Sequence, residues 1–373
     1  MIKIMQVVPA LNDGGAETLI KDYALNLDKK KFEVVVVTIY NYEYTANYKI
    51  LKENNVRIVS VYEKWNFKNK IINKLFKKQY ITQKFGEIIK QENPQCIHIH
   101  MDILKYFTPL KKQLTGRKLF YTCHNIPARY FDGTRIDEFE SAKTLINRNN
   151  LQLIALHKTM AKELNEMFDV SNTIILNNCI NLERFKNVIE TKEDIRRKLG
   201  IPSNAFVIGN VGRFAKEKNH EFIVRVFNEV TKKCDNAFLM LIGQGTEKEK
   251  IREELNQYGI LNKTIFFEHR NDVPQLMKAM DVLLFPSKVE GFPITLIEAQ
   301  AVGIKCVIST CITEEVVLTN NVVRLNLQDS IQLWVEAVLD NSIIITNDSR
   351  IDSFDKKHVI FQLERLYLGE KHE

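Results

Sequence analysis

Apolar runs rich in β-branched residues alternate with segments of helical periodicity along the whole chain. Continuous apolar strands that alternate with helices are typical of parallel sheets covered on both faces. Two such series, each about one domain long, predict an α/β fold with two Rossmann-like, doubly wound domains. The predicted strands are Ile2–Val8, Phe32–Thr38, Arg57–Val61, Cys96–His100, Lys118–Cys123, Leu151–Ala155, Thr173–Leu176, Phe206–Val211, Phe238–Ile242, Thr264–Phe267, Val282–Phe285 and Lys305–Ile308.

The polar stretch Asn177–Val188 separates the two series, so we expect domains at residues 1–180 and 181–350. The segment 351–373 contains a helical pattern, Ser353–Leu368, with no strand after it. Its apolar face needs a cover, and we expect this helix to pack back across to the first domain. Ligands of open parallel sheets bind beyond the carboxyl ends of the strands, so functional motifs should directly follow strands.

The composition is that of an ordinary globular protein. Of the 373 residues, 45% are hydrophobic and 27% are charged, which excludes wholesale disorder. No apolar stretch reaches the roughly 18 to 20 residues of a membrane-spanning helix, and Met1–Leu11 is interpreted as a buried strand, not as a secretion signal. The six cysteines form neither a CxxC pair nor a metal-binding spacing, which favours reduced thiols in a cytosolic protein.

The net charge is +7, and the excess of basic residues lies in the first half of the chain. The segment Lys64–Lys90 holds eight lysines, one acidic residue and apolar residues spaced by three or four. This pattern predicts a basic amphipathic helix that binds an anionic membrane surface. An ordinary helix with a lysine-rich solvent face fits equally well, whereas nucleic acid binding has no accompanying motif. The candidate membrane contacts are Trp65, Lys68, Lys70, Lys74, Lys77 and Lys78.

Two glycine-containing turns follow predicted strands. Gly14 and Gly15 lie between the first strand and the first helix, where the backbone can approach a ligand and the helix presents free N–H groups. Neither GxGxxG nor a P-loop is present, and a Gly-Gly turn alone is often only a tight corner. After Phe206–Val211, Arg213 and Lys218 could converge on a diphosphate; the alternative is a solvated loop with scattered charge.

A third motif, residues 290–299 (EGFPITLIEA), follows the strand that ends at Phe285. Pro293 stands where a helix would begin, which suits its fixed φ and its missing N–H. Glu290 then lies in the loop, and Glu298 projects from the helix near a ligand bound at the amino end.

Taken together, the GGAE turn, the GRFAKEKN loop, the SKVEGFPITLIEAQAVG block and the junction NNCINLERF closely resemble retaining GT-B glycosyltransferases of family 4. The resemblance covers nearly the whole chain, and the most similar subgroup makes bacterial capsular and exopolysaccharides. It implies a GT-B fold with two Rossmann-like domains facing a cleft.

The resemblance also implies roles for individual residues. Glu290 would lie against the donor sugar, Glu298 would hold the ribose hydroxyls, and Arg213 and Lys218 would neutralise the diphosphate. His124 would touch the sugar from the cleft wall; alone, it is as readily a structural histidine. The catalytic candidates are Glu290, Arg213, Lys218 and His124. The donor-binding candidates are Gly14, Gly15, Arg213, Lys218, Gly243, Arg270, Glu290, Gly291, Phe292, Pro293, Ile294 and Glu298.

The implied reaction moves a hexose from a nucleotide sugar, with UDP the expected nucleotide, to a lipid-linked glycan at the inner face of the membrane. Cations and a helix amino terminus can stabilise the departing diphosphate. Asp-x-Asp is absent from the sequence, so we expect a metal-independent, retaining transfer without a cofactor. A sugar-nucleotide epimerase or hydrolase of the same fold, or a non-catalytic nucleotide-sugar-binding partner, remain the alternatives. Departures from the family pattern, such as His157 and Cys311, concern acceptor or sugar preference.

Overall fold

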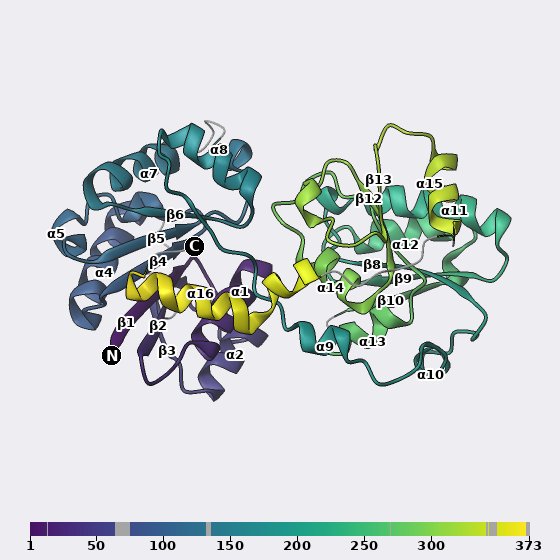
Figure 1. Cartoon of the computed structure of the whole chain (residues 1–373), viewed down its shortest axis with the longest axis horizontal. Helices are drawn as coiled ribbons and strands as arrows, with labels where there is room; N and C mark the ends of the chain where they lie inside the picture. The colour runs from purple at the N-terminus through teal and green to yellow at the C-terminus, as the bar shows by residue number, and fades with distance from the viewer. Residues whose placement is uncertain are drawn as a thin grey trace. The chain divides into compact units, whose positions relative to one another are not determined.

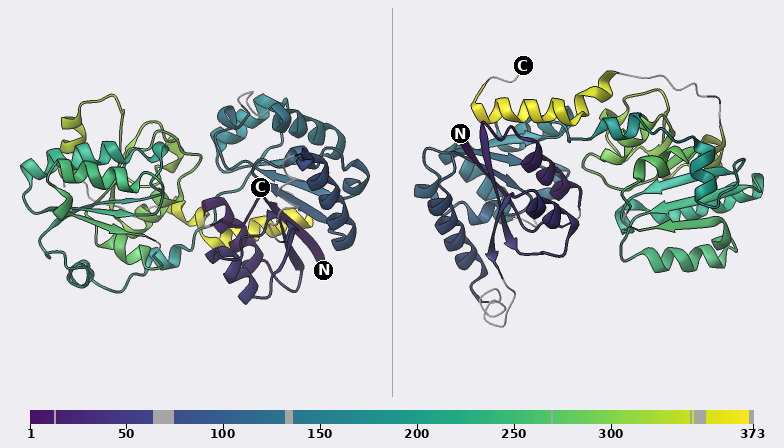
Figure 2. Two further views of the ribbon diagram at one scale, coloured as in Figure 1. Left: turned by 180° about the vertical axis from the view of Figure 1, so that it is seen from behind. Right: turned by 90° about the horizontal axis from the view of Figure 1, so that it is seen from below.

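The computed structural model describes residues 1–12, 14–63, 75–131, 136–268, 270–340, 342 and 349–370. The chain folds into two compact units (Figure 1). Unit 1 comprises Met1–Cys179 together with Lys357–Glu373, and unit 2 comprises Ile180–Lys356. Each unit is built around one parallel sheet, and helices cover both faces of it (Figures 1 and 2).

Among the described residues, unit 1 has a seven-stranded parallel sheet in the order β3-β2-β1-β4-β5-β6-β7. Its strands are β1 Ile2–Val8, β2 Phe32–Tyr40, β3 Arg57–Tyr62, β4 Cys96–His100, β5 Lys118–Thr122, β6 Gln152–Ala155 and β7 Ile174–Ile175. Its helices are α1 Gly15–Asn26, α2 Ala46–Glu53, α4 Lys77–Glu92, α5 Lys111–Leu114, α6 Pro127–Tyr130, α7 Ile136–Asn149, α8 Lys158–Phe168 and α16 Lys356–Leu368, with the 3₁₀ turn η1 Leu104–Tyr106.

Unit 2 has a six-stranded parallel sheet in the order β10-β9-β8-β11-β12-β13, counted over the same described ranges. Its strands are β8 Phe206–Val211, β9 Ala237–Ile242, β10 Thr264–Phe267, β11 Val282–Phe285, β12 Lys305–Ser309 and β13 Val322–Leu325. Its helices are α9 Leu182–Lys186, α10 Lys192–Lys198, α11 His220–Lys233, α12 Lys248–Gln257, α13 Val273–Lys278, α14 Ile294–Val302 and α15 Ile331–Leu339, with the 3₁₀ segments η2 Lys216–Lys218, η3 Leu261–Lys263, η4 Glu314–Val316 and η5 Ser349–Phe354.

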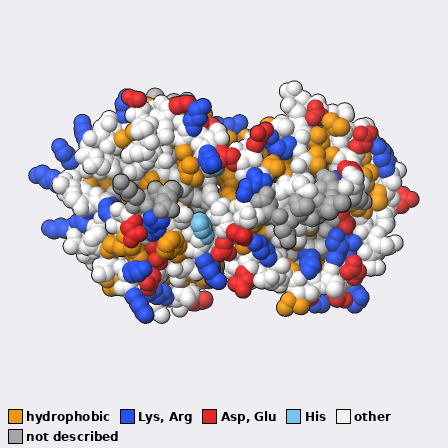
Figure 3. Space-filling model, in the orientation of Figure 1, with side chains coloured by type: hydrophobic (Ala, Val, Ile, Leu, Met, Phe, Trp, Pro, Cys, Tyr) orange, Lys and Arg blue, Asp and Glu red, His pale blue; other side chains and the backbone are white. Residues whose placement is uncertain are grey.

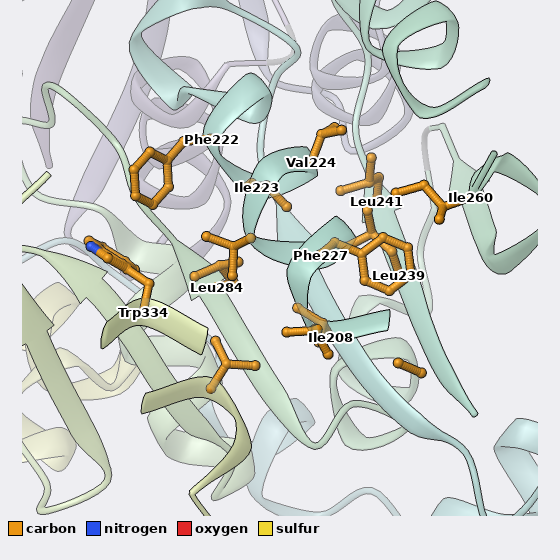
Figure 4. Close-up of a cluster of buried hydrophobic side chains, with 14 of the residues drawn as sticks. Ile208, Phe222, Ile223, Val224, Phe227, Leu239, Leu241, Ile260, Leu284 and Trp334 are labelled. Carbon is orange, nitrogen blue, oxygen red and sulfur yellow. The ribbon is translucent and has the colours of Figure 1, made fainter. Parts of the chain in front are cut away.

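The core of unit 2 lies between its sheet and the helices α11 and α15 (Figure 4). Trp334 of α15 is fully buried, packs edge-on against Phe222 of α11, and donates its indole N–H to the carbonyl of Asn326 at 3.1 Å. Ile208, Leu239 and Leu284 enter the same cluster from three adjacent strands. Burial of this apolar surface is the main stabilising contribution to such a core.

Helix α16 completes the core of unit 1, although it comes last in the chain (Figures 1 and 2). Its buried side chains pack against apolar residues of α1 and of strands β1, β2, β4 and β5. They are Val359, Ile360, Leu363, Leu366 and Tyr367. The ammonium group of Lys118 donates to the carbonyl of Tyr367 at 2.9 Å, which satisfies one of the open carbonyls at the helix end.

The predicted α/β class with two parallel sheets is confirmed. Two details of the prediction are wrong. Strand β13 was not predicted; it is a short edge strand and only half-buried, so its apolar pattern is weak. The helix predicted across Lys64–Lys90 is not continuous, because Phe76 has φ −134° and ψ 25°, and α4 begins at Lys77. Residues 64–74, including Trp65, Lys68, Lys70 and Lys74, lie outside the described residues.

Candidate functional site

In unit 2, the strand order reverses between β8 and β11, and two candidate loops leave the sheet at this point. The loop after β8 carries Arg213 and Lys218, and the loop after β11 carries Glu290. Such a switch point opens a crevice at the carboxyl ends of the strands, where open α/β sheets bind their ligands. The topology therefore brings the two motifs to the edge of the sheet at which open α/β sheets generally bind ligands.

Three polar contacts join the two loops. The side-chain amide of Asn219 donates to the carbonyl of Pro286 at 3.1 Å, and the N–H of Lys288 donates to the carbonyl of Glu217 at 2.8 Å. The third contact joins the candidate residues themselves, because Lys218 Nζ lies 2.7 Å from Glu290 Oε1. Asn219 has φ 59°, a left-handed conformation that asparagine tolerates, and it turns the chain into α11.

The Lys218–Glu290 pair is well shielded, with side-chain exposures of 17% and 10%. The ammonium group also lies 5.2 Å from the ring centre of Phe285, at the end of β11. A shielded ion pair loses much more than a surface pair when one partner is removed, because the other charge stays poorly solvated. The pair therefore holds both loops in register and keeps one cation and one carboxylate together at the strand ends.

Arg213 is placed differently. Its side chain is 74% exposed and pairs with Glu217 at 3.4 Å within the same loop. Arg270 follows β10, two strands away from β8, and makes two hydrogen bonds to Asp272, one of them from Nε to Oδ1 at 2.7 Å. The described structure thus brings Lys218 and Glu290 together, whereas Arg213 and Arg270 each bind a neighbouring carboxylate.

Gly243 has a structural requirement of its own. Its φ is +152°, and a Cβ atom there would lie 2.0 Å from the carbonyl oxygen of Gly212. The N–H of Phe214 also donates to the carbonyl of Gln244 at 2.9 Å. The turn after β9 therefore supports the loop of Arg213 and Lys218 through direct backbone contact.

Residues 290–298 lead into α14 as the sequence indicates. Pro293 is the cap residue and Ile294 the first residue of the helix, so a proline without an N–H costs no hydrogen bond there. Phe292 is buried and its ring stacks on Phe354 at 5.4 Å, which anchors the loop of Gly291 to η5.

Glu298 lies on α14, which packs against α9. Burial raises the pKa of its carboxyl to about 7, and the positive charge of Arg184 on α9 partly opposes this rise. Glu298 can therefore exist as a neutral hydrogen-bond donor or as a carboxylate acceptor near neutral pH.

In unit 1, Gly14 is the cap residue of α1. A Cβ atom on Gly14 would lie 2.5 Å from a carboxylate oxygen of Glu17, so this carboxylate folds back over the turn. A Cβ on Gly15 would meet nothing within 4 Å, so there is open space beside the helix amino terminus. Such space and free N–H groups can accept an anionic group.

His124 is the second residue after β5 and is partly exposed. Burial lowers the pKa of its imidazole to about 4, so the ring is neutral at physiological pH. Its Nε2 lies 2.9 Å from Nδ1 of His100, at the end of β4. The sequence analysis did not predict His100 or His98, although their alternation in Cys96–His100 places both on one face of a strand.

Lys77 and Lys78 are the membrane-contact candidates within the described residues. Lys77 Nζ lies 5.8 Å from the ring centre of Tyr40, and Lys78 pairs with Asp137 at 3.3 Å. Leu75 and Phe76 beside them are 62% and 59% exposed. On the face drawn in Figure 3, basic and acidic side chains are interspersed. No helix in the described parts of the chain combines the length and the apolar character needed to cross a bilayer.

Two family models match consecutive parts of the chain. "Glycosyltransferase Family 4" matches residues 13–184, and "Glycosyl transferases group 1" matches residues 191–341. The chain is 27% identical over 350 residues to the putative glycosyltransferase EpsF of Bacillus subtilis (strain 168), covering 90% of this chain and 86% of EpsF.

Two further proteins are similar. The UDP-Gal:alpha-D-GlcNAc-diphosphoundecaprenol alpha-1,3-galactosyltransferase of Escherichia coli is 24% identical over 235 residues, covering 60% of this chain and 59% of that enzyme. The crystal structure of Anabaena Alr3699/HepE in complex with UDP and glucose matches with a TM-score of 0.78 and 18% identity, covering 99% of this chain and 100% of HepE. The chain therefore belongs to the family 4, group 1 glycosyltransferases and has the GT-B fold.

Proposed function

We propose that this protein transfers a hexose from a UDP-sugar to a lipid-linked saccharide in the synthesis of a bacterial capsular or exopolysaccharide, with retention of the anomeric configuration and without a metal. The Lys218–Glu290 pair at the switch point of unit 2 carries the proposal. The name of the similar Escherichia coli galactosyltransferase supports a UDP-sugar and a polyprenyl-linked acceptor, and HepE was crystallised in complex with UDP and glucose.

The chemistry assigns a part to each group. Cleavage of the sugar–phosphate bond leaves negative charge on the diphosphate, which the ammonium group of Lys218 and the exposed guanidinium of Arg213 can stabilise. Glu290 pairs with Lys218 and would lie against the donor sugar. Glu298 would accept hydrogen bonds from the ribose hydroxyls when ionised.

Enzymatic assay of the purified chain with a panel of UDP-sugars and a synthetic polyprenyl-diphosphate saccharide tests the reaction. We expect saccharide extension with retained anomeric configuration by NMR, and undiminished activity in EDTA. UDP with an altered or free sugar and no extended acceptor would instead identify an epimerase or hydrolase. Binding of UDP without any turnover would identify a non-catalytic partner.

The role of the ion pair is tested with Lys218→Met and Glu290→Ala. Loss of a group that stabilises transition-state charge typically lowers kcat about 10²- to 10³-fold. The matched control is Lys288→Met, because Lys288 lies in the same loop as Glu290 with an exposed side chain. If Lys218→Met and Lys288→Met have equal kcat, Lys218 is not part of the site.

We further propose that the enzyme works at the inner face of the membrane, held there by the segment that includes Lys77 and Lys78. Exposed Leu75 and Phe76 next to two lysines suit an anionic lipid surface. Lys77→Glu/Lys78→Glu should weaken flotation with phosphatidylglycerol vesicles, whereas Lys111→Glu/Lys112→Glu, on the exposed side of α5, should not. Equal flotation of both variants would show that Lys77 and Lys78 belong to an ordinary solvated helix face and do not bind the membrane.

A further inference from the structure

A buried hydrogen-bonded chain in unit 1 ends at His124. Its six members come from the adjacent strands β1, β4 and β5, from the second residue after β5 and from α16. The chain runs in the order Thr122, His98, Tyr367, Gln6, His100 and His124, and consecutive polar atoms lie 2.7–2.9 Å apart.

The protonation state of the three histidines restricts what each ring can do. Burial lowers the pKa of His98 to about 3 and that of His100 well below its usual value, as it does for His124. A neutral imidazole has one N–H donor and one bare nitrogen acceptor. When both nitrogens of a histidine ring are hydrogen-bonded, one of them therefore donates its N–H and the other accepts a hydrogen bond.

The side-chain amide of Gln6 sets the direction of the hydrogen bonds. Its Nε2 donates to the hydroxyl of Tyr367 at 2.7 Å, and its Oε1 accepts from Nε2–H of His100 at 2.8 Å. Nδ1 of His100 is then bare, so it accepts from Nε2–H of His124. This leaves Nδ1 of His124 without a proton, and it has no hydrogen-bond partner in the described part of the chain.

The other half of the chain agrees with this direction. The hydroxyl of Tyr367 accepts from Gln6, so its own proton is donated to Nδ1 of His98. His98 then carries its proton on Nε2 and donates to Oγ1 of Thr122 at 2.7 Å. Every side-chain nitrogen and oxygen of this hydrogen-bonded chain other than Nδ1 of His124 therefore has a partner, as buried polar groups require.

We propose that Gln6 and Tyr367 are positioning residues that fix His124 as the Nε2–H tautomer, so that its bare Nδ1 accepts a hydrogen bond from a hydroxyl group of the bound substrate. This rests on the proposed function, in which the substrate is a sugar. Through α16, the last helix thus sets the hydrogen-bonding capacity of a candidate active-site residue in the middle of unit 1.

NMR of the full chain labelled with ¹⁵N-histidine tests the tautomer directly. Two-bond ¹H–¹⁵N correlations distinguish the protonated from the bare ring nitrogen, and the His124→Asn variant assigns the signals. We expect a bare Nδ1 and a protonated Nε2. A protonated Nδ1 in the wild-type chain means that the hydrogen bonds run in the opposite direction, and it overturns the proposal.

The role of Tyr367 is tested with Tyr367→Phe, which removes the acceptor for Gln6 and the donor to His98. His124 should then populate both tautomers. Tyr23→Phe is the matched control, because Tyr23 is buried in the same core, its ring centre is 6.3 Å from that of His98, and its hydroxyl has no hydrogen-bond partner among the described residues. Identical His124 signals in the two variants would refute the role of Tyr367.

Gln6→Met removes both hydrogen bonds of the Gln6 amide and keeps the length of the side chain. If Tyr367→Phe does not fold, this variant tests in its place whether the hydrogen bonds fix the tautomer of His124. In turnover of a UDP-sugar, we expect Tyr367→Phe to lower kcat about three- to tenfold, the effect of one neutral hydrogen bond, with unchanged affinity for UDP. The tautomer is measured without any donor sugar. If the protein has the Nε2–H tautomer of His124 but transfers no sugar, the proposed function is refuted and the tautomer assignment stands.

Discussion

The raised pKa of Glu298 makes the stability of unit 2 depend on pH. The carboxyl of a glutamate titrates near 4.5 in an unfolded chain and near 7 in this fold. Because the folded state binds this proton more tightly, protonation of Glu298 favours folding. The contribution is complete below about pH 4.5 and is lost as the pH rises through 7. At about 1.4 kcal/mol per pKa unit, it amounts to about 3 kcal/mol.

Glu298→Gln replaces the carboxyl by an uncharged group of the same shape. We expect wild type and variant to have similar free energies of unfolding at pH 5, and the variant to be more stable by up to about 3 kcal/mol at pH 8.5. The free energies of unfolding of wild type and variant must be compared at each pH, because the pH dependence of either protein alone also includes buried His220, whose contribution changes with pH in the opposite direction. Burial and the charge of Lys218 lower its pKa to about 4, so its contribution is lost as the pH falls below 6.5.

Urea unfolding followed by the fluorescence of Trp334 measures this difference, since Trp334 lies in the core of unit 2. The chain has two tryptophans, so a Trp65→Phe background makes Trp334 the only one. Glu336→Gln, on the exposed side of α15, controls for the loss of a negative charge from unit 2. A variant that is no more stable than wild type at pH 8.5, or equally stabilised at both pH values, would refute the reasoning.

Three further predictions concern packing and thiol chemistry. Leu363→Ala on α16 should lower the free energy of unfolding of unit 1 by about 2–5 kcal/mol in calorimetry, because Leu363 is fully buried; an unchanged melting temperature would show that α16 does not contribute to that core. Gly243→Ala should lower both the stability of unit 2 and its affinity for UDP in thermal-shift titrations, because the added Cβ would overlap the carbonyl of Gly212. Gly259→Ala is the control: its Cβ would meet only open space, so this variant should lower stability without changing the affinity for UDP. In the native protein, exposed Cys311 should react with an aromatic disulfide reagent much faster than Cys123 and Cys306. These two thiols are buried, and burial raises their pKa to about 12, so few are ionised. Equal reaction rates for the three cysteines would contradict the burial of Cys123 and Cys306.

The sequence predicts the sheets better than the details of the site. Short apolar runs such as Val282–Phe285 that alternate with helical segments are typical of buried parallel strands, and family membership is confirmed. The half-buried edge strand β13 has no such pattern. The motifs also predict which loops carry Lys218 and Glu290, but the 2.7 Å contact between them depends on how two loops pack across β8 and β11.

The hydrogen-bonded chain that ends at His124 could not be predicted from the sequence. His98 and Tyr367 are 269 residues apart in sequence, and their hydrogen bond exists only because α16 returns to the sheet of unit 1. Helical periodicity predicts the apolar face of α16, but it does not specify that one hydroxyl on this face meets a histidine. Such pairings depend on tertiary packing and were not predicted.

The late position of α16 has a consequence for synthesis of the protein on the ribosome. The strands and helices of unit 1 up to Cys179 leave the ribosome first, and the side chains from Val359 to Tyr367 that complete their core emerge only after all of unit 2. At roughly 5–20 residues per second, this delay is on the order of 10 to 40 s. During that time the apolar surface that α16 later covers is open to solvent, so nascent unit 1 is a natural client for chaperones, and unit 2 can finish folding before it.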